Sequence, residues 1–355
     1  MTINDLLKVL FLTSRVMTNA RFIIAMILIA SMFSCERSNS DDLIQFPFEY
    51  GKFSEYEEFT SNIEKSVASV CFIDDKNGFA TENGVILKTM DGGLTWTSNN
   101  ITDLPLNSIY FLDNKIGFAV GGESSCGGTG CTPPGSVVFK TNDSGDNWTK
   151  LNIPYEWSEL NSVSFINENI GFAIGLGLQI KTIDGGETWE QFEFESKGFM
   201  SKIAFVNFQT GFCAGIDGNI FKTSNQGENW TKTVNESDGH IYDFCFVNEK
   251  VGYACGQKEI VKTIDGGESW KILTNSPFEL YFIHFSDSEN GIAIGSGHYT
   301  GGCFGTWTKA IYWTNNGGLT WTMEDDIEFG YSTSFYNKNE GYSIANGKTY
   351  KIICK

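Results

Sequence analysis

The chain repeats one pattern of apolar and polar positions at intervals of about 40 residues. Between residues 161 and 194, the short apolar runs NSVSFIN, GFAIG, LQIKT and WEQFEF alternate with turns rich in Asn, Asp and Gly. The first run alternates around Val163 and Phe165. Four such runs predict a four-stranded antiparallel meander. No helical periodicity of useful length follows residue 40, so we expect an all-β protein.

Two short motifs recur in step within this pattern. The first, KTIDGGETW at 181–189, has five further copies, which begin at residues 88, 140, 222, 262 and 313. The second reads Phe, usually an apolar residue, Asp or Asn, three variable residues, Gly and usually an aromatic residue. It begins at Phe72, Phe111, Phe165, Phe205, Phe246, Phe285 and Phe335. Self-similarity at this period indicates a propeller.

The numbers of the two motifs predict how the ring closes. One sheet cannot bury both of its faces alone, so the units must stack around a ring. The second motif occurs seven times, the first only six times, and the chain ends where the seventh Gly-rich turn would begin. The aromatic segment IQFPFEYGKFSEYEEF can supply the missing strand. We predict a seven-bladed β-propeller of four-stranded antiparallel blades over residues 44–355, closed by an N-terminal strand within 44–60 that pairs with the strand at 349–353.

The Gly-rich motif is predicted to be a structural turn between the third and fourth strands. The carboxylate of Asp184 can accept local backbone N–H groups, the two glycines allow positive φ, and Trp189 can be buried between blades. Asn225 and Asn316 replace the Asp in two copies, which a turn tolerates and a catalytic acid does not. The structural positions are Asp91, Trp96, Asp143, Trp148, Asp184, Trp189, Asn225, Trp230, Asp265, Trp270, Asn316 and Trp321.

These turns resemble the Asp boxes, or BNR repeats, of sialidases, of sortilin-type receptors and of the photosystem II stability and assembly factor family. The seven-unit chain is most similar to the last of these, over residues 44–355. The resemblance implies an Asp-box propeller that binds a protein partner. Arg15, Arg21 and Arg37 are the only arginines and all precede the propeller, so the arginine patch of that family has no counterpart here and its partner is not carried over.

Residues 17–35 have the pattern of a secretory signal. Arg21 supplies the basic n-region, an apolar run follows, and Cys35 comes after the small Ser34. The segment resembles a bacterial lipoprotein signal with lipidation at Cys35; the alternative is a short membrane anchor, although the run is short for a span. We therefore expect a signal at 1–35, a linker at 36–43, and a lipid-anchored protein of the bacterial cell envelope, on the outer membrane at its periplasmic or surface side.

Charge and cysteines narrow the range of ligands. The chain has 25 basic and 43 acidic residues. Loss of residues 1–34 would remove three basic residues and one acidic residue, and the net charge of −18 would become −20. Such a surface repels nucleic acid. Cys126 and Cys131 lie in one Gly-rich loop and are expected to form a disulfide, with free thiols as the alternative. No second CxxC or His pair completes a metal site, and we expect no metal and no cofactor.

The remaining cysteines of the repeats and one histidine are expected to be structural. Cys71 and Cys213 lie within predicted strands, as do Cys245 and Cys255, which are expected to point to opposite faces of their hairpin and to stay unpaired. His284 occupies a first-strand position and is expected to line the central channel.

Catalysis has little support in the sequence. Sialidases bind the substrate carboxylate with three arginines, and lysine does not reproduce bidentate guanidinium recognition. Glycoside hydrolysis needs two carboxylates across a cleft, and xyloglucan-active Asp-box enzymes form that cleft between two propellers, whereas this chain has the length of one. The histidines occur without a GxSxG motif. We therefore expect no enzymatic activity.

Loop topology predicts the binding face. The turns between strands one and two and between strands three and four share one face, with the Asp boxes. The two large insertions, at about 121–136 and 295–309, are loops between strands two and three and lie on the opposite face, together with the links between blades. Loop aromatics on a rigid scaffold can bind a partner, or they can cover the blade ends. The candidate binding residues are His298, Tyr299, Phe304, Trp307, Tyr155 and Trp157.

The sequence thus predicts a lipid-anchored propeller that binds an envelope protein as an assembly, stability or scaffold factor, with contact to the membrane only through its lipid. The alternative is a propeller that binds or cleaves glycans, because aromatic side chains also stack on sugars.

Overall fold

The computed structural model describes residues 48–51, 53, 55–63, 67–123, 135–154, 158–192, 198–276, 278–299, 307–325, 327, 329–345 and 347–354. Only the backbone is described at 48–50, Val234, Asn275, His298 and Tyr299. The predictions for residues 1–43, including lipidation at Cys35, lie outside the described residues, as does the predicted disulfide between Cys126 and Cys131.

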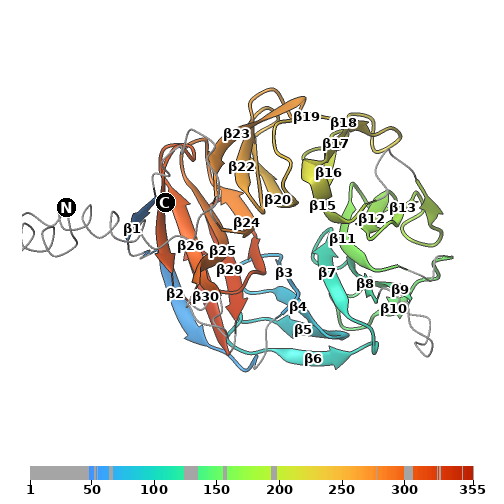
Figure 1. The fold of residues 1–355 in the computed structure, drawn as a ribbon. Helices are drawn as coiled ribbons and strands as arrows, with labels where there is room; N and C mark the ends of the chain where they lie inside the picture. Colours follow the sequence, from blue (N-terminus) through green and yellow to red (C-terminus); the bar gives the residue numbers. More distant parts are fainter. Residues whose placement is uncertain are drawn as a thin grey trace, which may run out of the picture. The chain divides into compact units, whose positions relative to one another are not determined.

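Within the unit Phe46–Lys355, seven antiparallel β-sheets follow one another around a ring (Figure 1). In each blade the first strand lies innermost and the following strands pair outward in chain order, with β1 (Phe48–Tyr50), β2 (Tyr56–Thr60) and β19 (Val234–Asn235) added at the outer edges of blades 6, 7 and 5. The described residues contain a single 3₁₀ turn, η2 (Ile216–Gly218), and otherwise only strands and their connections. The predicted all-β, seven-bladed propeller is confirmed.

The strands have the following bounds. Blade 1 consists of β3 (Ser69–Phe72), β4 (Gly78–Glu82), β5 (Val85–Thr89) and β6 (Thr97–Asn100). Blade 2 consists of β7 (Leu106–Phe111), β8 (Gly117–Gly122), β9 (Ser136–Thr141) and β10 (Thr149–Lys150). Blade 3 consists of β11 (Leu160–Phe165), β12 (Gly171–Gly175), β13 (Gln179–Thr182) and β14 (Glu190–Gln191). Blade 4 consists of β15 (Met200–Phe205), β16 (Gly211–Gly215), β17 (Ile220–Thr223) and β18 (Thr231–Lys232). Blade 5 consists of β20 (Ile241–Phe246), β21 (Gly252–Gly256), β22 (Glu259–Thr263) and β23 (Ser269–Asn275). Blade 6 consists of β24 (Leu280–Phe285), β25 (Gly291–Tyr299), β26 (Trp307–Thr314) and β27 (Trp321–Asp325). Blade 7 contains β28 (Thr333–Phe335), β29 (Glu340–Ala345) and β30 (Lys348–Ile353).

The ring closes through the N-terminal segment, as predicted. Strand β2 (Tyr56–Thr60) pairs antiparallel with β30 and is the fourth strand of blade 7, with Tyr56 opposite Ile352. Two further pairings were not predicted: β1 (Phe48–Tyr50) lies parallel to β27, and β19 (Val234–Asn235) lies parallel to β23. Each covers backbone groups that the outer edge of a blade would otherwise expose.

Aromatic stacking explains why the second motif needs both Phe and Gly. A Cβ on Gly171 would lie 2.3 Å from the ring of Phe165, so only glycine leaves room for that ring over the neighbouring strand. The ring of Phe165 also stacks on Phe118 of the preceding blade, with centroids 3.7 Å apart. Phe72 and Tyr342 stack in the same way across the junction of blades 1 and 7, at 4.0 Å. The motif therefore builds the contact between adjacent blades.

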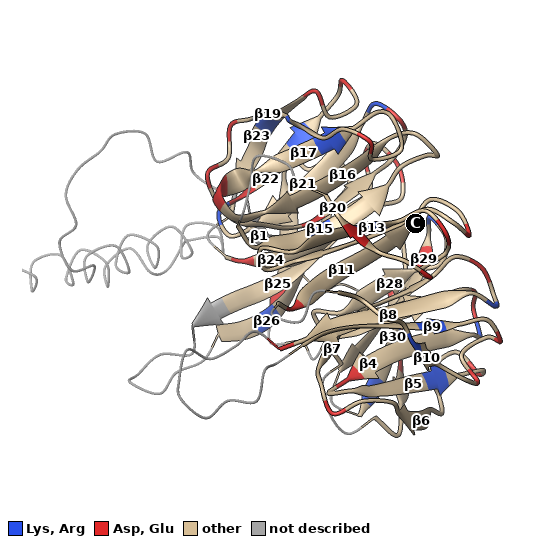
Figure 2. Cartoon of the chain, turned by 90° about the vertical axis from the view of Figure 1, so that its right-hand side faces the viewer, with Lys and Arg blue, Asp and Glu red and all other residues tan. Residues whose placement is uncertain are grey.

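The Asp boxes are turns, and their geometry matches the structural reading. Asp184 Oδ1 accepts the Thr188 N–H at 2.9 Å, and the Thr182 hydroxyl accepts the Gly186 N–H at 2.8 Å. Gly185 and Gly186 have φ of 73° and 94°, which favours glycine. The hydrogen bond from Thr188, above all, lowers the pKa of Asp184 to about 2. Figure 2 shows acidic positions at many of the turns on the right-hand side of the view.

One expectation about the cysteines is wrong. Cys245 pairs with Tyr253, and Asp243 pairs with Cys255, so Cys245 and Cys255 lie diagonally on the same face of their hairpin. The prediction failed because the register pairs odd-numbered residues of one strand with odd-numbered residues of the other, and paired residues share one face of the sheet. Both thiols are free, and Cys255 is buried in the core between blades 5 and 6, against which Cys245 packs.

Candidate functional site

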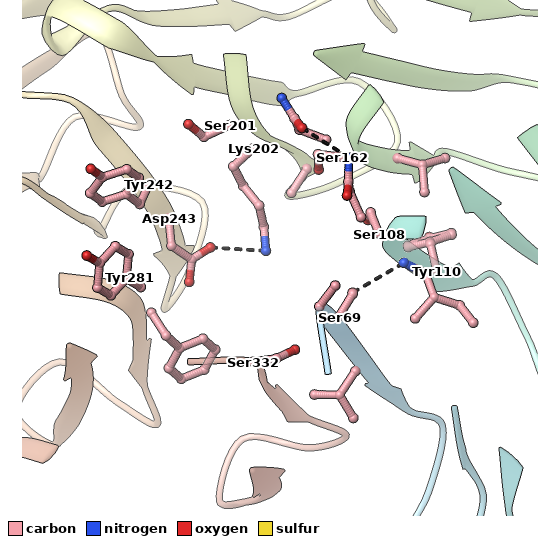
Figure 3. Close-up of a pocket in the computed structure, with 18 of the residues that line it drawn as sticks. Ser69, Ser108, Tyr110, Ser162, Ser201, Lys202, Tyr242, Asp243, Tyr281 and Ser332 are labelled. Carbon is pink, nitrogen blue, oxygen red and sulfur yellow. Dashed lines mark hydrogen bonds and ion pairs between the residues drawn. The ribbon is translucent and has the colours of Figure 1, made fainter. Parts of the chain in front are cut away.

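The innermost strands of all seven blades surround a central cavity of about 390 Å³ (Figure 3). Its wall consists of equivalent positions of the repeat, because the propeller places the same residue of each first strand at the same height in the ring. Two layers of side chains can be distinguished: a lower layer inside the channel, and an upper layer at the mouth where the first strands begin.

The lower layer is mostly serine. Ser69, Ser108, Ser162 and Ser332 occupy the equivalent positions of blades 1, 2, 3 and 7. The hydroxyl of Ser162 accepts the backbone N–H of Ile203 in the next blade at 3.1 Å. A short polar side chain at this position therefore connects one blade to the next.

Three blades depart from serine in this layer: blade 6 has Phe282, and blades 4 and 5 have the charged residues Lys202 and Asp243. Lys202 Nζ lies 3.0 Å from Asp243 Oδ1, and both side chains point into the centre of the ring (Figure 3). Asp243 Oδ2 accepts the Ile283 N–H of the next blade at 3.1 Å, so the aspartate connects blades as serine does. The Lys202 side chain is 40% exposed and that of Asp243 only 7%. The charge of Asp243 raises the pKa of Lys202, which stays protonated at neutral pH.

The Lys202–Asp243 pair also borders a second cavity, of about 450 Å³, that extends toward the turns between strands one and two. His284 lines this cavity, as predicted for the channel. Its ring stacks on Phe335 with centroids 3.8 Å apart, and its Nε2 lies 2.8 Å from the Lys338 carbonyl oxygen. Burial lowers the pKa of His284. The ring stacking and the backbone contact hold His284 in the wall of this cavity.

The upper layer carries a run of aromatic side chains that spans blades 4 to 7. Phe199, His240, Tyr242, Tyr281 and Tyr331 form this aromatic arc. Successive ring centroids are 5.4, 4.4, 5.0 and 4.6 Å apart. Across the mouth, blades 1 to 3 present the smaller Ala68, Asn107 and Asn161. The mouth is therefore asymmetric, with one aromatic half and one half of small or amide side chains.

Polar contacts fix the arc in place. The Tyr281 hydroxyl donates to a carboxylate oxygen of Glu279, and burial, followed by that bond, raises the pKa of Tyr281. Ser201 Oγ and His240 Nε2 are 2.6 Å apart. Burial lowers the pKa of His240, which favours the neutral ring at pH 7. Rigid aromatic groups of this kind offer a large contact area at little cost in conformational entropy.

Three of the predicted binding residues, Trp307, His298 and Tyr299, lie in the β25–β26 hairpin of blade 6. Trp307 is 56% exposed at the start of β26, and its ring lies 6.2 Å from that of Phe278. Two residues further along β26, Lys309 Nζ lies 4.9 Å from the centre of the Tyr331 ring. His298 and Tyr299 end strand β25, opposite β26, with backbone alone described. Phe304, Tyr155 and Trp157 lie outside the described residues.

Sequence reasoning did not assign a site role to Lys202, Asp243, His240, Tyr242 or Tyr331. An alignment of the seven first strands carries the signal, because Lys and Asp replace Ser in one column and Tyr recurs in the column before it. The Asp-box residues lie at the opposite ends of the blades, and none of them lines either cavity.

The cavity at the mouth holds few charged side chains. Asp243 is the only acidic residue among the described residues that line it. Its partners are Lys202 and a backbone N–H, whereas a glycosidase needs two carboxylates facing one bond. Within the described part of the chain, no three His, Cys, Asp or Glu side chains gather as metal ligands, and no helix is long and apolar enough to cross a membrane.

The seven blades and the six Asp-box turns define the chain as a seven-bladed BNR propeller. The model of the family described as photosynthesis system II assembly factor YCF48 matches residues 105–245. YCF48 bound to a D1 peptide superposes with a TM-score of 0.64 at 17% identity, covering 87% of this chain and 100% of that one. YCF48 from Cyanidioschyzon merolae gives 0.64 at 15%, with 84% and 99% covered. The chain therefore has the propeller fold of these structures, and its residues 105–245 are similar to the YCF48 family.

More distant propellers share the fold. The GH74 xyloglucanase from Xanthomonas campestris superposes with a TM-score of 0.63 at 10% identity, covering 82% of this chain and 52% of that one. At this identity the likeness concerns the fold alone. No curated protein sequence matches the chain.

Proposed function

We propose that the chain is a non-enzymatic, lipid-anchored protein of the bacterial cell envelope whose propeller binds a protein partner as an assembly or scaffold factor. The aromatic arc carries the proposal. Tyr242 and Tyr281 lie near the starts of first strands and Tyr331 just before one, while blade 6 also presents the exposed Trp307 on the long β25–β26 hairpin. The lipoprotein-like signal at 17–35 supports the location, and the likeness to YCF48, solved with a D1 peptide, supports a peptide-like ligand.

Glycan binding is the second candidate, because tyrosines at a cavity mouth also stack on sugar rings. Its support is the same arc. Glycan binding and protein binding differ in the contacts that they require. A glycan site needs side chains that hydrogen-bond many hydroxyl groups, whereas a protein segment also uses ion pairs and apolar contacts.

Site-specific photocrosslinking in the native membrane tests the proposal. A photoreactive residue replaces Tyr331 at the arc, and a matched one replaces Phe208, which is exposed on the Asp-box face. We expect one discrete envelope protein to be captured from position 331 and not from 208, and purified wild-type propeller to compete for it better than a Tyr242→Ala, Tyr281→Ala variant. Capture only from position 208, or of polysaccharide alone, would contradict the proposal.

A further inference from the structure

The fold does not require charged side chains at the positions of Lys202 and Asp243. Serine fills the same layer in four blades, and Ser162 shows that a hydroxyl is enough to accept the N–H of the next blade. Asp243 makes that connection through Oδ2, and Lys202 then balances its charge. Taking two charges out of water carries a desolvation cost that serine avoids. Perturbed and partly buried charges of this kind gather at functional sites.

The two members of the pair differ in access to a ligand. The Asp243 side chain is 7% exposed, and its oxygens face Lys202 and Ile283 N. The Lys202 side chain is 40% exposed toward the cavity. An ammonium group has three N–H donors, and among the described residues Asp243 is the one ion-pair partner of Lys202. Lys202 therefore keeps donors for a ligand, whereas Asp243 does not accept a second cation.

The surroundings favour an acceptor that carries negative charge. Lys309, whose Nζ lies over the ring of Tyr331, adds a second positive charge at the mouth. The nearby Glu279 is held by the Tyr281 hydroxyl. The rest of the protein is strongly acidic, with 43 acidic and 25 basic residues in the chain. Most of the surface therefore repels an acidic segment, whereas Lys202 and Lys309 offer positive charges at the mouth beside the carboxylates of Asp243 and Glu279.

We propose that the channel mouth selects extended protein segments with an acidic side chain, which passes the aromatic arc and binds Lys202. The inference rests on the proposed function and specifies the chemistry of its ligand. Asp and Glu have the length and charge for such a contact, and a charge-assisted hydrogen bond is stronger than a neutral one. Lys202 is then the residue that determines specificity, and the arc supplies most of the contact area.

The test uses a displayed library of random 12-residue peptides, selected on the wild-type propeller and on three variants. Lys202→Ser with Asp243→Ser restores the serine of other blades and avoids a buried unpaired charge. Lys115→Ser changes the charge of an exposed lysine outside both cavities and serves as the control. Tyr242→Ala with Tyr281→Ala removes the centre of the arc.

We expect peptides rich in Asp and Glu from the wild type and from the control, and peptides without this bias from the double-serine variant. The best acidic peptide should bind the double-serine variant roughly tenfold to a hundredfold more weakly, the loss expected for one charged hydrogen bond. The same loss should follow when its acidic residue is changed to the amide. An equal bias in wild type and double-serine variant, with both folded, overturns the inference and leaves the proposed function intact. If no enrichment depends on the tyrosines, the proposed function fails together with it.

Discussion

Trp189 stands perpendicular to Phe165, with ring centroids 6.1 Å apart and planes at 90°. The two rings come from the two sequence motifs, and equivalent pairs recur in the other blades that carry an Asp box. Their centroids are 5.7 to 6.1 Å apart in Phe72–Trp96, Phe111–Trp148, Phe205–Trp230, Phe246–Trp270 and Phe285–Trp321. This edge-to-face contact explains why the motifs run in step, since neither ring is packed without the other.

Replacement of Trp189 by Ala should lower the free energy of unfolding by about 3 to 5 kcal/mol, because it empties a buried aromatic site. Trp189 is 4% exposed. Chemical denaturation measures the loss. The matched change of Trp148, which is only half-buried, should cost less. Unchanged stability with lost partner binding in Trp189→Ala would overturn the structural role of the box.

Deletion of residues 44–60 should abolish cooperative folding, because blade 7 would keep three strands and expose the edge of β30. Deletion of 44–51 alone removes β1 and leaves β2, so we expect a folded ring with a lower melting temperature. Thermal unfolding followed by circular dichroism separates the two. A 44–60 deletion that melts as sharply as the parent, at the same temperature, would show another mode of closure.

Loss of Trp307 and Tyr299 together should weaken partner capture by about 2 kcal/mol or more with little change in melting temperature, since loop aromatics can act as hot spots without supporting the core. Alanine at Asp91 and Asp265 should lower the melting temperature and leave partner capture by the folded protein unchanged, because turn hydrogen bonds are lost. Titration of the captured partner and thermal melts of both variants decide between these outcomes. Lost binding in a folded Asp91, Asp265 variant alone would place the working surface on the Asp-box face.

Cys35→Ala should release the protein from the membrane fraction while the propeller stays folded, because the predicted anchor is one acylated cysteine outside the ring. Fractionation and immunoblotting follow the protein, and a melt of the released form checks folding. Retention of a folded Cys35→Ala protein in the membrane would contradict lipidation at this residue.

Stability should fall as the pH drops below about 6.5, the ordinary pKa of histidine. Burial lowers the pKa of His240 and His284 in the folded state, although Glu279 and Asp217 oppose this for His240, and Asp243 and the Lys338 carbonyl for His284. The unfolded chain therefore binds more protons in this range, and protonation favours unfolding. Denaturant midpoints at pH 7.5 and 5.5 measure the effect, which should shrink in a His240→Gln, His284→Gln variant.

A second loss is expected at lower pH. The pKa of Asp143 is held at about 2, first by the Asn147 side chain, and that of Asp184 at about 2, first by Thr188. Their contribution is complete above pH 4 and disappears between about pH 4 and 2. Because this window lies below that of the histidines, the two effects separate in one titration of stability against pH. Asp184→Asn, which keeps an acceptor as Asn225 does, should reduce the second loss and not the first.

The sequence by itself determined the number of blades, the Asp-box turns and the closing strand, because one local pattern repeats seven times, the other six times, and the difference indicated a missing strand. The pairing of Tyr56 with Ile352 followed from a count of motifs. The parallel addition of β1 to β27 did not, since backbone pairing at a blade edge requires no side-chain pattern.

Only the tertiary structure decided the site. Lys202 and Asp243 lie on neighbouring blades, and their 3.0 Å contact arises because closure of the ring brings equivalent positions side by side. The aromatic arc from Phe199 to Tyr331 forms for the same reason: blade 5 contributes two side chains and blades 4, 6 and 7 one each, and the rings meet only around the shared axis. Repetition along the chain is therefore visible in the sequence, whereas contacts around the axis depend on how each blade rotates its first strand toward the channel.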